Sequence, residues 1–264
     1  MSLTTELFGR MLREEWRLHE HLFGGRRFAA FPVTVALLAA GGFALLSYTG
    51  TPFDAIVAGL HGLLFFFGLQ VGTIGLVGRD ALRDALGDMT LLVFSARTLP
   101  VSWNRLLAVF LWKDLVYYTV FFVAPIGLAA VPTALSSGVS PTRIALLWLT
   151  LIGAFALGVT LSLTLAGAAT RSRLLVAGPV ALVVAAVLWP GVDALAYTPY
   201  ALYRDPSALA AVRGFAPIAL FGVLGPLLFR PADSGAYRTT GERFTTLRGW
   251  LRDGDGLTRG RCSR

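Results

Sequence analysis

The residues with the most distinctive charge pattern lie in one stretch, 79–114. Asp80, Asp84 and Asp88 recur at every fourth position, so a helix would carry them along one face. Arg83 can pair with Asp80, but Asp84 and Asp88 have no basic residue three or four positions away. Like charges at this spacing destabilise an isolated helix. The stripe is therefore either a solvated face or a surface that meets basic residues on a partner protein.

Groups suited to catalysis or metal binding are sparse. His19 and His21 are two positions apart, roughly 200° around a helix, so they do not share a face as two zinc ligands would. Lys113 is the only lysine and no glycine-rich loop precedes it, so the chain lacks the loop that binds nucleotide phosphates in ATPases. Cys262, the single cysteine, excludes an intrachain disulfide. We predict no catalytic residue, no metal site and no cofactor, and we expect that the chain is not an enzyme.

Long apolar runs must position these residues. Charged residues make up only 14% of the 264, against about 25% in a soluble domain, and the mean hydropathy is +0.67. Repeated uncharged runs separated by short arginine-bearing stretches are typical of membrane spans. The sequence therefore predicts an all-α integral membrane protein with six transmembrane helices. The predicted spans are 28–48, 55–78, 115–131, 144–168, 174–189 and 214–229.

Two flanking segments complete the predicted organisation. Residues 1–27 contain an amphipathic helix over 3–23, which can lie in the membrane surface. Residues 230–264 form a basic tail. In this tail, ERFTTLRGWLRD fits either a basic helix on anionic lipid or a disordered arginine-rich segment. The apolar face of that helix would consist of Phe244, Leu247, Trp250 and Leu251.

The distribution of arginine predicts the orientation. If the N-terminus is cytoplasmic, every basic residue except Arg143, Arg204 and Arg213 lies in a cytoplasmic segment. Cytoplasmic loops of membrane proteins collect Lys and Arg, so both termini are expected inside the cell and the protein in the plasma membrane. The formal net charge of +8 then reflects this bias, and we expect no nucleic-acid partner.

The third helix is expected to begin below the membrane. Pro100 marks a break, and Ser102 is a suitable N-cap for a helix that starts next to it. Apolar residues then recur at helical spacing, so one rigid helix would join the charged stretch to the third span. The stripe consists of Trp103, Leu106, Leu107, Phe110 and Leu111.

Polar residues within the spans are few, which argues against an ion-coupled carrier. Gln70, Thr73 and Asp114 are candidates for a translocation path or for contacts between helices. Gly68 and Gly72 have the spacing of a close helix contact, with weak support for a dimer face. The fourth span carries hydroxyl groups of the kind that bridge helices, at Thr150, Thr160, Ser162 and Thr164.

The stretch FSARTLPVSWNRLLAVFLWKDLVYY, residues 94–118, together with the six-span pattern, resembles the permease subunit of type-two ATP-binding-cassette transporters from archaea, including halophiles. The resemblance implies that 3–23 is an elbow helix, and that the segment around 79–100, within the cytoplasmic loop 79–114, contains a coupling helix. It also implies that 190–213 forms short re-entrant outer helices. The coupling residues would be Arg79, Asp80, Arg83, Asp84, Asp88 and Arg97.

The same resemblance implies the partners. Energy would come from a separate ATPase subunit that binds ATP, and the permease would act as a homodimer or with a related permease. Export is the expected direction, and membrane lipid the expected surroundings. Two alternatives stay open: an enzyme embedded in the membrane, and a scaffold subunit that transports nothing.

Overall fold

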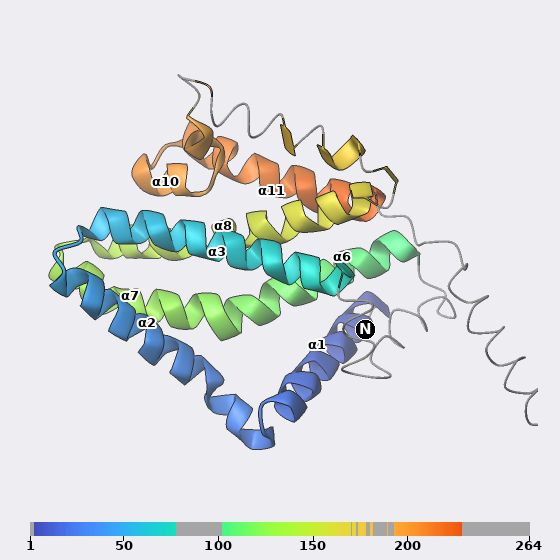
Figure 1. The fold of residues 1–264 in the computed structure, drawn as a ribbon, viewed down its shortest axis with the longest axis horizontal. Helices are drawn as coiled ribbons and strands as arrows, with labels where there is room; N and C mark the ends of the chain where they lie inside the picture. Colours follow the sequence, from blue (N-terminus) through green and yellow to red (C-terminus); the bar gives the residue numbers. More distant parts are fainter. Residues whose placement is uncertain are drawn as a thin grey trace, which may run out of the picture. The chain divides into compact units, whose positions relative to one another are not determined.

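The computed structural model describes residues 3–77, 102–169, 171–172, 174–177, 180–181, 189 and 193–228. All of them belong to one unit, Met1–Phe229, and within these ranges the regular structure is helical, with no strand (Figure 1). The helices are α1 Leu3–Leu22, η1 Gly25–Ala30, α2 Phe31–Tyr48, α3 Phe53–Val77, α6 Trp103–Tyr118, η3 Thr119–Val123, α7 Ala124–Ser136, α8 Pro141–Ala169, η4 Ala194–Tyr197, α10 Tyr200–Arg204 and α11 Ala208–Leu228.

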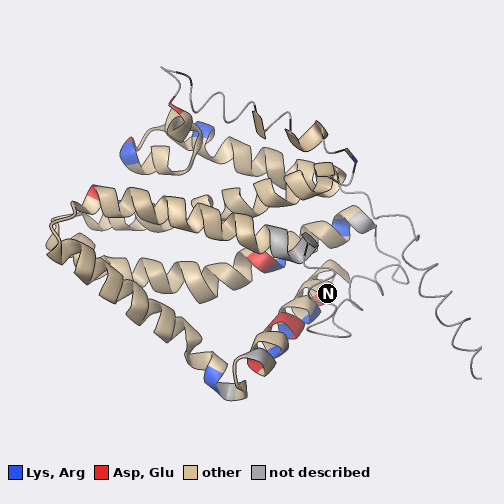
Figure 2. Ribbon diagram, in the orientation of Figure 1, with Lys and Arg blue, Asp and Glu red and all other residues tan. Residues whose placement is uncertain are grey.

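Five helical segments of the described chain are long and apolar enough to cross a membrane. Their middle portions hold almost no charged residue, as Figure 2 shows. The prediction of an all-α protein with several helices suited to crossing a membrane is confirmed for the described residues. The predicted fifth span, 174–189, lies largely outside the described residues, as do the coupling segment 79–100 and the tail. The five segments are Arg27–Tyr48, Phe53–Gly72, Asn104–Ser136, Pro141–Ala169 and Ala208–Leu228.

The third segment differs most from its prediction. The helix begins at Trp103, directly after Ser102, and continues through a π-helical turn, Thr119–Val123, to Ser136. Residues 103–114 of the predicted loop therefore belong to the helix, as the apolar stripe indicated. At the other end the helix passes through Pro132, where the sequence suggested a loop. Proline removes one backbone hydrogen bond, and packing against neighbouring helices offsets that loss in apolar surroundings.

Helix α8 lies at the centre of the bundle, packed between α3 and α11. In the most apolar stretch of α8, 61% of the residues are buried, whereas in that of α2 only 6% are. A Cβ atom on Gly68 would lie 2.2 Å from the backbone oxygen of Phe155, and one on Gly158 would lie 2.2 Å from that of Phe65. Gly68 and Gly72 thus allow α3 to touch α8 within one chain, which corrects the suggestion of a dimer face.

Candidate functional site

Helix α1 packs along the beginning of the third membrane-crossing helix. At its start, the Arg105 guanidinium donates a hydrogen bond to the Thr4 hydroxyl. Further along, the ring of Trp16 meets that of Phe121 edge-on at 5.6 Å, and His19 lies 5.2 Å from Tyr117. Contacts along most of α1 therefore fix it to one side of α6 and η3.

A cluster of three charged residues, Glu15, Lys113 and Asp114, lies in the middle of this contact and is called the ion cluster below. The Lys113 ammonium donates a hydrogen bond to Glu15 Oε2 at 2.6 Å and forms an ion pair with Asp114 on the same helix. The Lys113 side chain is 2% exposed, that of Asp114 5% and that of Glu15 19%. The cluster is thus almost fully removed from water.

The composition of the ion cluster explains why it can be buried. One isolated buried charge costs several kcal/mol, so buried charges occur in pairs or networks. Here Lys113 lies between two carboxylates, and its ammonium also lies 4.5 Å from the centre of the Phe110 ring, a cation–π distance. The three formal charges sum to −1. Lys113 therefore supplies the positive charge that offsets the cost of burying both carboxylates.

A second buried polar group joins α3 to α8 at the opposite end of the bundle. His61 Nδ1 lies 2.8 Å from the carbonyl oxygen of Val57, which can only accept, so this nitrogen carries the proton. Nε2 then accepts from the Thr150 hydroxyl at 2.9 Å. The rings of Tyr200 and Tyr203 lie 5.0 and 6.1 Å from the His61 ring. With both nitrogens occupied, His61 connects helices and is not free to bind a ligand.

Tyr203 lies between His61 and Arg143, which is near the start of α8. The Arg143 guanidinium lies 5.2 Å from the centre of the Tyr203 ring. Burial raises the pKa of Tyr203, against the opposing effect of Arg143, so the phenol stays protonated at neutral pH. The described residues around Tyr203 thus provide packing and hydrogen bonds.

No family model, curated protein or solved structure matches the chain. Its function must therefore follow from its own residues.

The structure separates the three predicted polar candidates. Gln70 is exposed on the surface of α3, and Asp114 is buried in the ion cluster. The side chain of Thr73 lies outside the described residues. Asp114 thus forms an ion pair with Lys113 on its own helix. The coupling residues Arg79, Asp80, Arg83, Asp84, Asp88 and Arg97 also lie outside the described residues.

Sequence reasoning missed two of the three residues in the ion cluster. Sequence patterns assign Lys113 no structural partner, and they include Glu15 only within the amphipathic helix over 3–23. The adjacent pair Lys113-Asp114 inside an otherwise apolar run was the available signal, because charges in such a run are buried and paired. Glu15 gave no such signal, since it lies 98 positions away in the chain.

Proposed function

We propose that the chain is the permease subunit of an ATP-binding-cassette transporter, with energy supplied by a separate ATPase subunit. The observation that carries this proposal is the ion cluster. It joins α1 to a helix that starts directly after the charged segment 79–100 and runs without interruption to Ser136. At 1.5 Å per residue this helix is roughly 50 Å long, which exceeds the apolar core of a bilayer, about 30 Å.

Such a helix transmits movement from one side of the membrane to the other. In the proposed mechanism, ATP binding closes the ATPase subunits and displaces segment 79–100. Because α1 is attached to α6 by Glu15 and Lys113, the two helices move together. The displacement then changes the packing of the bundle between inward-open and outward-open states. Export of the substrate is the proposed direction.

The properties of Lys113 support a separate ATPase. A nucleotide-binding loop needs a lysine that reaches the phosphates. The only lysine of the chain is 2% exposed and paired with two carboxylates. ATP hydrolysis therefore belongs to a partner in this proposal, and the permease pairs with a second copy or a related permease.

Connectivity supports six spans with both termini in the cytoplasm. Near the end of α8, Arg171 donates to the backbone oxygens of Leu227 and Leu228 in α11. Near the start of α8, Arg143 lies over Tyr203. The described residues 171 and 203 therefore lie near opposite ends of α8, and a crossing by the predicted fifth span, 174–189, would connect them. We place the protein in the plasma membrane.

Co-purification tests the proposal directly. The full-length chain is isolated from native membranes in mild detergent, and bound proteins are identified by mass spectrometry. We expect an ATPase subunit with a nucleotide-binding cassette. The double variant Asp84→Lys with Asp88→Lys should reduce its recovery at least about tenfold, because like charges across an interface cost several kcal/mol.

The matched control is Asp205→Lys, the same reversal at an exposed acid at the opposite end of the bundle. It should leave recovery of the ATPase unchanged. Recovery of the chain alone at several salt concentrations would reject the permease role in favour of an enzyme that acts alone in the membrane. Equal recovery with the double variant would reject the assignment of the coupling segment.

A further inference from the structure

An apolar groove lies between α1 and the third membrane-crossing helix. Its volume is about 240 Å³, which is smaller than the pockets of about 300–1,000 Å³ that enclose drug-sized ligands. Val120 is 55% exposed, so the groove is open along one side. It can therefore hold a slender apolar chain but not a whole lipid molecule. Its apolar lining includes Leu12, Trp16, Val116, Val120 and Phe121.

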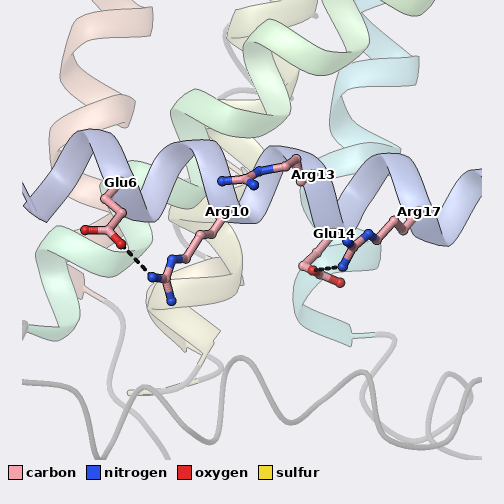
Figure 3. A pocket seen from close by; sticks show the side chains of 5 residues that line it. All are labelled: Glu6, Arg10, Arg13, Glu14 and Arg17. Carbon is pink, nitrogen blue, oxygen red and sulfur yellow. Dashed lines mark hydrogen bonds and ion pairs between the residues drawn. The ribbon is translucent and has the colours of Figure 1, made fainter. Parts of the chain in front are cut away.

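Arg13 lies at the edge of this groove and also lines a charged groove along α1. In the charged groove, Arg10 pairs with Glu6 and Arg17 pairs with Glu14. Figure 3 shows the Arg13 side chain apart from both pairs. Among the described residues, its guanidinium bonds only the backbone oxygen of Gly9, through Nε at 3.3 Å. Arg13 thus leaves one positive charge and two amino groups for a ligand.

The position of the groove matches the surface of a bilayer. An apolar core of about 30 Å takes about 20 helical residues. Counting that length back from Ser136, the end of α7, reaches Tyr117, which lies beside the groove. Val116 and Val120 then lie where acyl chains meet head groups, and Arg13 of α1 lies beside them. Trp16 is also the residue type that is enriched at this depth.

We propose that the groove binds an anionic phospholipid, with one acyl chain on its apolar side chains and the phosphate on Arg13. Arginine holds phosphate through two parallel hydrogen bonds, and the unpaired charge of Arg13 favours a lipid with a net negative charge. The site requires insertion in a membrane but does not depend on the role as a permease. It determines which lipid lies beside the junction of α1 and α6.

Native mass spectrometry of the full-length protein tests the phosphate contact. The protein is stripped of lipid in detergent and titrated with dioleoyl phosphatidylglycerol. Arg13→Gln should bind at least about tenfold more weakly, because a charge-assisted hydrogen bond is lost. The control is the charge-neutral double variant Glu6→Gln with Arg10→Gln, which removes a neighbouring pair from the same helix and should bind as the wild type does. Equal binding by Arg13→Gln would overturn the proposal.

A second set of variants tests the acyl-chain contact. Val120→Trp fills the groove and should also weaken binding about tenfold, whereas Leu128→Trp, at an exposed site on α7, should not. If Val120→Trp fails to fold, Val116→Phe obstructs the same groove. Displacement of the lipid by millimolar inorganic phosphate would show a simple anion site and overturn the proposal. Equal affinity for phosphatidylcholine would overturn the proposed preference for anionic lipid.

Discussion

Replacement of Lys113 by methionine tests whether the ion cluster holds α1 against the bundle. The variant leaves Glu15 and Asp114 in a buried site without a cation. At the observed 2.6 Å, the attraction between Lys113 and Glu15 is about 6 kcal/mol for an effective dielectric constant of about 20. Desolvation offsets part of this, and loss of one partner from a buried pair typically costs about 3–5 kcal/mol. We therefore expect the apparent melting temperature to fall by roughly 10 °C.

Two matched variants separate charge from packing. Glu15→Gln leaves Lys113 paired with Asp114, a group with no net charge, so its cost should be only about 1 kcal/mol. Glu6→Gln makes the same chemical change on the same helix, but its partner Arg10 and Glu6 itself are exposed. Exposed ion pairs contribute less than about 1 kcal/mol. The expected order of destabilisation is thus Lys113→Met, then Glu15→Gln, then Glu6→Gln.

Thermal unfolding in detergent, followed by fluorescence-detected size-exclusion chromatography, gives the order of stability. Spin labels on α1 and α7, in a protein with Cys262 replaced by serine, show whether α1 leaves its site. Lys113→Met should broaden the distance distribution between the labels, and Glu6→Gln should not. The proposed role of the ion cluster is wrong if Lys113→Met and Glu6→Gln have equal melting temperatures. It is also wrong if Glu15→Gln lowers the melting temperature more than Lys113→Met does.

Two further predictions concern α8. Gly68→Ala places a Cβ atom 2.2 Å from a backbone oxygen and should lower the free energy of unfolding by about 1–3 kcal/mol. Gly59→Ala, whose Cβ atom would have nothing within 4 Å, should be neutral. Equal melting temperatures of the two variants would contradict the close contact between α3 and α8. Thr150→Val leaves His61 Nε2 without its partner and should cost about 1–2 kcal/mol. Thr160→Val loses only a bond to its own helix and should cost less, and the reverse order of melting temperatures would count against the bridging role.

Local patterns predicted the elements well. Uninterrupted apolar runs are long enough to indicate crossing helices by themselves, and five predicted spans overlap described helices with shifts at their ends. Ser102 and the apolar stripe after it predicted where the third helix begins, and Leu106, Leu107 and Leu111 are buried. The bridging role expected for hydroxyl groups is confirmed where Thr164 donates to the Phe221 carbonyl.

Contacts between distant segments could not be predicted in the same way. Hydropathy is insensitive to which helix a glycine faces, so Gly68 and Gly72 were open to either an internal or a dimer contact. The predicted third span ends at residue 131 because Pro132 follows it and proline breaks most helices in water. The partner of Lys113 depends on the fold bringing α1 beside α6, and no spacing rule connects positions 15 and 113.

The two charges at positions 13 and 15 together specify the rotation of α1 about its axis. Two positions along a helix correspond to about 200°, so Glu15 and Arg13 point in nearly opposite directions. Glu15 meets Lys113 inside the bundle, while Arg13 is exposed beside the proposed lipid phosphate. A half-turn of α1 would place Arg13 beside Lys113 and Glu15 beside the phosphate, with repulsion at both places. The same two side chains therefore favour one orientation of α1, through attraction in the native arrangement and repulsion in the alternative.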